Sequence, residues 1–232
     1  MLSAQPPNDT IRAETPPVIY PAALADAGII AQISVDAFPQ LFRSLYGRRS
    51  TERIVAAQTA LYAAGVLDLA RYRVAALSGA VVGVCAHNTT GEIGAATFRT
   101  ILRTVRPHLS FPAALRAAIG VSTTLAVVPR RIPCAPDILY IEALAVTSHL
   151  RSHGIGTSLL RHAAATAVTA GRPRLSLHVM RDNNRAYALY RRFGFIDWKD
   201  PPQAQWMTHD SRLMVLNIEP HHMMLPPGSA GR

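Results

Sequence analysis

Hydrophobic residues recur along this chain at two different spacings, and each spacing predicts a different element. A helical spacing runs through residues 22–38, where Pro39 is expected to end the helix, and through residues 51–64, where Gly65 is expected to end it. Short apolar runs predict strands instead. These runs are residues 18–20, 71–77, 81–87, 138–146, 175–180 and 212–218. The second and third runs are separated only by Ser78-Gly79-Ala80 and predict a β-hairpin.

The region 138–195 combines both spacings in the order strand, turn, helix, strand and helix. An apolar run, ILYIEALAV, leads into a polar turn that contains two glycines, and an amphipathic helix follows. A second apolar run, LSLHVM, then precedes another helix, which closes with Phe193-Gly194-Phe195. We expect the rest of the chain to be organised around this region.

Between the hairpin and the ILYIEALAV run, two apolar stretches predict additional helices, the second of which is one helix or a pair. They are residues 92–105 and 111–128. No internal repeat and no linker is visible, so we expect a single domain over residues 18–219 with a helical insertion at 92–128. The terminal segments are expected to be disordered at 1–17 and mobile at 220–232.

The composition argues against several classes of protein. No uncharged apolar run is long enough to span a bilayer, and the N-terminus lacks the features of a secretory signal, so we expect a cytoplasmic protein without a membrane partner. Cys85 and Cys134 are too few for a disulfide framework and lack metal-ligand spacing, so we expect two reduced thiols. The pair His221-His222 is only a weak signal for a metal, and no metal site is predicted.

The chain is strongly basic, with a formal net charge of +10 and an isoelectric point near 10.6. Almost all of the basic charge comes from arginine, because Lys199 is the only lysine. This balance favours anionic partners such as nucleic acid, an acidic surface or a phosphorylated cofactor. The arginines are scattered rather than gathered in one run, so the charge is weak support for nucleic acid and no such partner is expected.

The turn from Arg151 to Gly156 has the features of an anion-binding site. It joins a strand to a helix, so backbone N–H groups and the positive end of the helix dipole would face a ligand there. A side chain at Gly154 or Gly156 would keep the backbone away from a phosphate. We therefore expect this turn to hold a phosphate-bearing ligand.

Two motifs in the same region resemble those of the GCN5-related N-acetyltransferases, the GNAT family. The first, Q/R-x-x-G-x-G/A, follows a strand and opens a helix, and the second, N-x-x-A-x-x-L-Y-x-x-x-G-F, is complete. The matching residues are Arg151, Gly154, Gly156, Asn183, Ala186, Leu189, Tyr190, Gly194 and Phe195. Within the family, this region resembles the branch of bacterial ribosomal-protein alanine N-acetyltransferases.

The resemblance implies an α/β (α+β) fold, with a splayed mixed β-sheet flanked by helices and a helical insertion before the central strand. It also implies acetyl-CoA as the acyl donor, held by a strand, by the glycine turn and by the loop after the next strand, with no metal. The residues at these positions are Leu144, Ala145, Val146, Arg151, Ser152, His153, Gly154, Ile155, Gly156, Thr157, Asn183 and Ala186. Dimers are common among similar proteins, so a homodimer is a further expectation.

Acetyl transfer to an amine needs one group that accepts a proton and one that donates a proton. An alkyl ammonium has a pKa near about 10.4 and must lose a proton before it attacks, and the departing thiolate must gain one. By resemblance, Tyr190 donates a proton to the CoA sulfur, although its spacing also suits a core aromatic residue. His178 and Glu142 are the candidate bases.

The choice between the two candidate bases stays open at the level of sequence. His178 lies in the second apolar run, where the alanine N-acetyltransferases carry a glutamate, and it either relays a proton or packs as a hydrogen-bonded strand residue. Glu142 is a lone carboxylate in an apolar strand, so burial would raise its pKa unless it faces solvent or pairs with an arginine. A water chain without a dedicated base is the third alternative.

These features predict an acetyl-CoA-dependent N-acetyltransferase that works by direct attack of a primary amine in a ternary complex. Cys85 and Cys134 lie outside both motifs, which argues against a cysteine-bound acetyl group. The alternative is a non-catalytic acyl-CoA-binding regulatory module. The acceptor is expected to be a small molecule or a protein N-terminus, because the low content of acidic residues disfavours polyamines and aminoglycosides.

Overall fold

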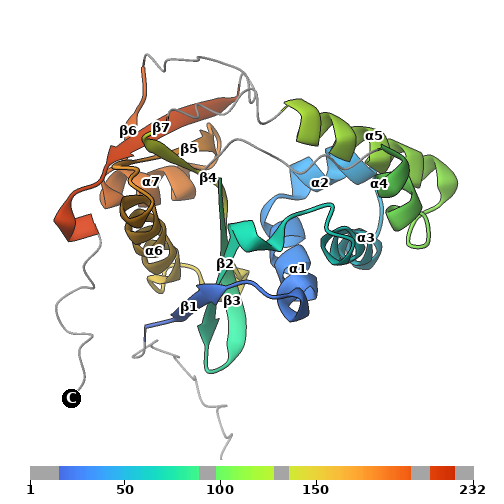
Figure 1. The fold of residues 1–232 in the computed structure, drawn as a ribbon, viewed down its shortest axis with the longest axis horizontal. Coiled ribbons are helices and arrows are strands. Elements are labelled where there is room, and N and C mark those ends of the chain that lie inside the picture. Colours follow the sequence, from blue (N-terminus) through green and yellow to red (C-terminus); the bar gives the residue numbers. More distant parts are fainter. Residues whose placement is uncertain (1–15, 89–97, 128–135, 200–209, 223–232) are drawn as a thin grey trace, which may run out of the picture.

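The computed structural model describes residues 16–88, 98–127, 136–199 and 210–222 (Figure 1). In this part of the chain a seven-stranded sheet has the strand order β1-β2-β3-β4-β5-β7-β6. The strands are β1 (Val18–Pro21), β2 (Tyr72–Leu77), β3 (Ala80–Asn88), β4 (Ile138–Val146), β5 (Arg174–Met180), β6 (Ile196–Asp197) and β7 (Ser211–Asn217). Neighbouring strands are antiparallel except β4 and β5, which are parallel, so the sheet is mixed as predicted.

The parallel strands β4 and β5 are paired over only part of their length. Their partners run from Ile138↔Arg174 to Ile141↔Leu177, and beyond that point β4 pairs with β3 and β5 pairs with β7. The register between β3 and β4 shifts immediately after Ile141, so Glu142 is the extra residue of a β-bulge. The sheet therefore opens between β4 and β5, which confirms the predicted splay.

Helices cover both faces of the sheet (Figure 1). On one face lie α6 (Ile155–Thr169) and α7 (Asn184–Phe193), and on the other lies α1 (Ala27–Ala37). Alternate residues of β3 serve the two faces, since Val84 packs with α1 and Cys85 packs with α6. Because both faces are covered, the central strands read as nearly continuous apolar runs.

Four further helices form a separate apolar cluster beside α1. They are α2 (Pro39–Tyr46), α3 (Thr51–Ala63), α4 (Phe98–Val105) and α5 (Phe111–Val127). The pair α4 and α5 lies between β3 and β4, which confirms the predicted helical insertion, although residues 89–97 lie outside the described part of the chain. Buried Ala114, Ala117 and Ala118 let neighbouring helices approach α5 closely. Arg116 donates to the carbonyl oxygen of Ser44 and so joins α5 to α2.

The N-terminal helices differ from the prediction at two boundaries. The helix predicted over residues 22–38 begins at Ala27, after a separate 3₁₀ turn at Leu24–Asp26. Pro39 does follow the end of α1, but it is also the first residue of α2, which is absent from the predicted elements. A proline suits that position because its missing N–H would have no intrahelical partner there.

The C-terminal part of the chain returns to the edge of the sheet. The two-residue strand β6 was not predicted, because so short a segment carries no readable period. After β7, Pro220–His222 form a 3₁₀ helix whose last side chain is buried. That imidazole lies so close to Gly194 (φ +114°) that an added Cβ would be 2.8 Å from its Nε2. The remainder of the tail, 223–232, lies outside the described residues.

Candidate functional site

A cleft of about 450 Å³ lies beside the end of β4, beyond the point where β4 leaves β5. Its walls come from β4, the turn before α6, the first turn of α6, one side of α7 and the end of α1. Most of the predicted donor-binding residues line it. These are Leu144, Ala145, Val146, Arg151, Ser152, Gly154, Gly156, Thr157, Asn183 and Ala186. The two sequence motifs therefore meet in one cavity.

The two positions of the turn that hold glycine do so for different structural reasons. Gly154 has a φ of +81° and nothing within 4 Å of an added Cβ, so the left-handed backbone rather than crowding is the reason for glycine there. Ser152, two residues earlier, also has a positive φ (+71°). Gly156 lies in the first turn of α6, where an added Cβ would be 3.1 Å from Cδ2 of Leu189 on α7. Gly156 thus sets how closely α6 approaches α7, a role that the local sequence pattern does not reveal.

The mouth of the cleft near the turn is electropositive. No side chain caps the start of α6, so its first N–H groups are available to a ligand. The Nε of Arg151 donates to the carbonyl oxygen of Val146 at 3.1 Å, which holds this guanidinium at the end of β4. From the opposite wall, Nη2 of Arg185 donates to Oγ of Ser152 at 2.9 Å. Two cations and a helix N-terminus therefore converge on the same opening.

Two of the predicted binding residues do not line the cleft with their side chains. Ile155 is buried in the core beneath α6, and His153 is exposed with its Nδ1 3.0 Å from the carbonyl oxygen of Arg151. Asn183 does line the cleft, and its Oδ1 also caps α7 by accepting from the N–H of Ala186 at 3.1 Å.

Other residues line the cleft but were not predicted as binding residues. They are Ala37, Phe38, Leu150, Arg185, Ala188, Leu189 and Arg192. Four of these lie three or four positions apart on α7 and could have been found by extending the helical face from the motif. Ala37 and Phe38, at the end of α1, reach the cleft through tertiary packing. No local sequence pattern predicts that they line it.

Tyr190 lies between the core and the cleft. Its ring packs against Phe195 with centroids 5.7 Å apart, and the residue also lines the cleft. Burial raises the pKa of its phenol well above the ordinary value, and the neighbouring Cys85 raises it further. Among the residues that the structure describes, none forms a hydrogen bond with its hydroxyl. Tyr190 is thus a core aromatic residue with a protonated hydroxyl, so both readings of its spacing are compatible with the structure.

Glu142 occupies the β-bulge and is paired there. Its Oε1 accepts from Nη2 of Arg71 at 2.6 Å and from Nδ2 of Asn88 at 3.1 Å. Burial raises the pKa of this carboxyl, and Arg71, which lies in the 3₁₀ helix Leu69–Arg71, offsets part of that rise. The pairing with an arginine that the sequence left open is therefore present, and the pKa is still raised.

His178 follows Leu177, the last residue of β5 that pairs with β4. Its Nδ1 lies 2.9 Å from the hydroxyl of Tyr140 on β4. Burial lowers the pKa of the imidazole to about 4, so the ring is neutral at physiological pH. Ile141 and Leu177 form the last pair between the two strands, so Glu142 and His178 each stand one residue beyond the point of separation. Neither side chain lines the cleft itself.

A family model described as the acetyltransferase (GNAT) family matches residues 48–195 of the chain. The chain belongs to the GNAT family. The match includes both motifs and all of the cleft except the end of α1. The family resemblance is therefore confirmed, whereas the narrower likeness to alanine N-acetyltransferases stays a prediction.

Individual relatives of this GNAT chain are distant or partial. A mycothiol acetyltransferase from Jonesia denitrificans is 46% identical over 57 residues, which cover 25% of this chain and 18% of that protein. The structure of an N-acetyltransferase from Staphylococcus aureus Mu50 matches with a TM-score of 0.62 at 17% identity, covering 86% of this chain and 100% of the other. PaiA N-acetyltransferase from Thermoplasma acidophilum, in complex with coenzyme A, matches with a TM-score of 0.51 at 11% identity, covering 87% and 99%. These structural matches show a shared fold.

The described ranges lack two further kinds of feature, a group of metal ligands and a membrane-spanning helix. Within residues 16–88, 98–127, 136–199 and 210–222, no three His, Cys, Asp or Glu side chains are grouped so that they could hold a metal ion. In the same ranges, no helix combines the length and the apolar character needed to cross a bilayer.

Proposed function

We propose that this GNAT chain is an N-acetyltransferase that moves an acetyl group from acetyl-CoA to a primary amine by direct attack in a ternary complex. One observation carries the proposal: a single cavity joins the uncapped start of α6 to the ring of Tyr190. The membership in the GNAT family supports acetyl-CoA as the donor, and so does the coenzyme A in the PaiA structure.

The residues of the cleft suit such a donor along its length. Phosphate oxygens would accept from the N–H groups at the start of α6 and would be near the guanidinium of Arg185. Beyond Ile141 one edge of β4 has no strand partner, so Leu144 and Val146 offer backbone groups to the amide-bearing arm of CoA.

Tyr190 is the proposed general acid. When the amine nitrogen has bonded to the carbonyl carbon and the carbon–sulfur bond breaks, the sulfur leaves as a thiolate, which is unstable beside an apolar wall. The phenol of Tyr190 is protonated at neutral pH, and the burial that raises its pKa would raise the pKa of a departing thiol in the same way, so the proton can pass to sulfur. No described residue competes for that hydroxyl.

Direct transfer is favoured over a covalent acetyl-enzyme by the state of Cys85. A cysteine attacks a thioester as the thiolate. Cys85 is 1% exposed, and burial raises the pKa of its thiol to about 12. The thiol of Cys85 is therefore protonated at neutral pH and buried away from any ligand in solvent. Cys134, the other cysteine, lies outside the described residues.

Glu142 is the better of the two candidate bases. Burial moves the two pKa values in opposite directions, upwards for Glu142 and down to about 4 for His178. A proton acceptor becomes a stronger base as its pKa rises towards the working pH. Burial therefore makes the Glu142 carboxylate a stronger base and the His178 imidazole a weaker one. The proton of the acceptor ammonium would pass to Glu142, through a water where the distance requires one.

The test is acetyl-CoA-dependent turnover on a panel of primary amines that includes peptides with free N-termini, with CoA release followed by a thiol reagent. We expect release with at least one class of amine, and initial-rate plots that intersect when both substrates are varied. Parallel lines would indicate a covalent intermediate instead. Tight acetyl-CoA binding without turnover on any amine would favour a non-catalytic acyl-CoA-binding regulator.

A further inference from the structure

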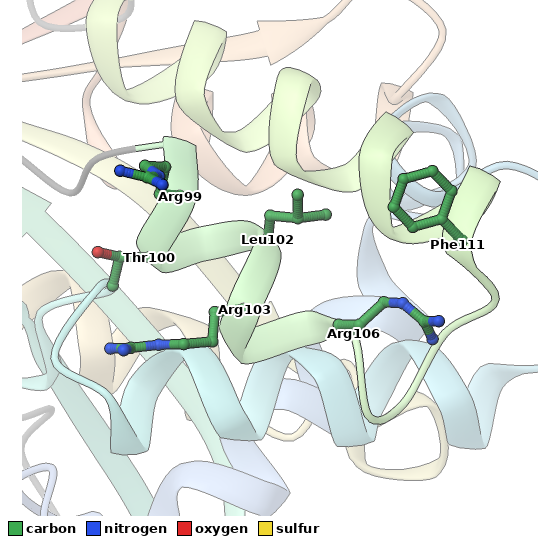
Figure 2. Close-up of a pocket in the computed structure, with 6 residues that line it drawn as sticks. All are labelled: Arg99, Thr100, Leu102, Arg103, Arg106 and Phe111. Atoms are coloured by element: carbon green, nitrogen blue, oxygen red, sulfur yellow. The ribbon is translucent and has the colours of Figure 1, made fainter.

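Three exposed arginines lie on α4 and just after its end, and we call them the α4 arginine surface: Arg99, Arg103 and Arg106. Figure 2 shows Arg99 and Arg103 on the helix, Arg106 in the turn that follows it, Leu102 between them and Phe111 at the start of α5. Ile101 and Val105 on the other side of α4 are fully buried, so the helix is held firmly while its arginines face outwards. A hollow of about 560 Å³ is lined by the three arginines together with Thr100, Leu102 and Phe111.

The α4 arginine surface lies in a stretch of the sequence that has no acidic residues. The sequence contains no Asp or Glu between Glu92 and Asp137, whereas it places several arginines there. In the described part of the structure, no carboxylate forms an ion pair with any of the three. The guanidinium of Arg106 lies over the ring of Phe111, 5.7 Å from its centroid, which leaves its N–H groups available at the edge. Among the described residues, no carboxylate would therefore compete with an anionic ligand for these guanidinium groups.

An apolar ridge runs along α5 next to this surface. Phe111, Leu115 and Ile119 are spaced four residues apart, so they lie on one side of the helix. They are 56%, 36% and 53% exposed, whereas alanines on the opposite side of α5 are buried. The hollow itself is lined by the three arginines and by the apolar side chains of Leu102 and Phe111, and from Phe111 the ridge continues along α5 outside the hollow.

We propose that this hollow is a docking site for an acidic segment of another protein, in which carboxylates alternate with apolar residues. Arginines four apart on a helix are separated by about 6 Å along its axis. Carboxylates at alternate positions of an extended peptide are separated by about 7 Å, which is a close match. Alternate side chains of such a peptide point in opposite directions, so the acids would face α4 while the apolar residues face the ridge on α5.

The arginines and the apolar ridge together favour a polypeptide over nucleic acid. Nucleic acid would use the arginines, but Leu115 and Ile119 offer its bases no stacking surface, and the one aromatic ring in the hollow is already covered by Arg106. An anionic membrane would use both kinds of residue as well, so anionic vesicles are one arm of the test. The proposal does not depend on acetyl transfer.

The experiment uses the full chain and a short fluorescent peptide that is N-terminally blocked and alternates Glu with Leu or Gly. Binding is followed by anisotropy at low and high salt. The test variant is Arg99→Gln/Arg103→Gln/Arg106→Gln. A matched control, Arg161→Gln/Arg181→Gln/Lys199→Gln, removes the same charge from another part of the molecule. Phe111→Ser tests the apolar ridge, and thermal unfolding checks that each variant is folded.

We expect the peptide to bind the unmodified chain and the control variant alike, and to bind the test variant about tenfold more weakly. Binding should weaken as salt is added, and Phe111→Ser should reduce the affinity for the Leu-containing peptide more than for a Glu/Gly peptide. Equal binding by the test and control variants would overturn the proposal, as would no binding at all. A single-stranded oligonucleotide or anionic vesicles that bind through the same arginines more tightly than the peptide would also overturn it.

Discussion

Two helical clusters, one packed on the sheet and the other beside α1, are built alike but constrain the sequence differently. The half formed by α6 and α7 and the half formed by α2 to α5 each bury a cluster of aliphatic and alanine side chains. Left-handed backbone occurs in both halves, but in the second half it follows the ends of α2 and α3, at Gly47 and Gly65, whereas in the first half it shapes the turn at Ser152 and Gly154 that borders the cleft. The second half reaches the cleft only where α1 leads into α2, at Phe38.

The difference shows where the chemistry constrains the chain. A site for a phosphate-bearing donor needs particular glycines, an uncapped helix and a placed phenol, so its residues form a readable motif. A helical cluster needs only apolar residues at the right period and size, which many sequences satisfy. The following predictions test whether donor binding and turnover reside in the first half, from the largest expected effect to the smallest.

Replacing Tyr190 by Phe should lower kcat by roughly 10²–10³-fold while leaving acetyl-CoA affinity nearly unchanged, because the ring still packs against Phe195 but no proton is supplied to sulfur. Turnover by CoA release and binding by calorimetry measure the two quantities. Tyr187→Phe is the matched control on the same helix: its hydroxyl donates to Asp197 and does not line the cleft. A similar loss in both variants would remove Tyr190 from the mechanism.

Replacing Glu142 by Gln should lower kcat/KM by about 10²-fold at neutral pH. It should also abolish the fall in kcat/KM that the unmodified enzyme shows as the pH is lowered. The base is active only when unprotonated, and burial raises its pKa, so activity should fall at a pH above the usual range of carboxyl groups. Gln keeps an acceptor for Arg71 and Asn88, which protects the fold. His178→Gln is the comparison, and a decline centred near pH 4 that disappears in that variant would make the imidazole the base instead.

Much of the α6–α7 half could be predicted from sequence because local requirements decide it. The glycine turn, the cap at Asn183 and the apolar period of α6 each depend on residues close together in the chain, and most predicted binding residues indeed line the cleft. The reason for Gly156 could not be read, since its neighbour Leu189 is brought to it by tertiary packing.

The point at which β4 and β5 separate is formed by contacts between residues that are distant in sequence. That Glu142 falls on a β-bulge and pairs with Arg71 follows from the register of β3 against β4, which no single strand specifies. That His178 meets Tyr140 follows from the parallel pairing of β4 with β5. The residue types could be singled out, but their partners and pKa directions needed the structure.

A pair of core truncations compares the two halves directly. Leu159 on α6 and Ile101 on α4 are both fully buried, so replacing either by Ala should lower the free energy of unfolding by about 3 kcal/mol. Denaturant titration measures this loss. Leu159→Ala should also weaken acetyl-CoA binding severalfold, because the start of α6 forms the cleft, whereas Ile101→Ala should leave it unchanged. Equal effects on binding would mean that the helical insertion supports the donor site.

The smallest predicted effect separates a ligand-binding glycine from a structural one. Gly154 (φ +81°) and Gly79 (φ +82°) have the same left-handed backbone, and neither has an atom within 4 Å of an added Cβ. Replacing either by Ala should therefore cost about 1 kcal/mol of unfolding free energy through backbone strain alone. Only Gly154→Ala should also weaken acetyl-CoA binding, since its methyl group would stand at the mouth of the cleft, while Gly79 lies in the β2–β3 turn. If calorimetry finds the same donor affinity in both variants, the turn before α6 does not hold the phosphates.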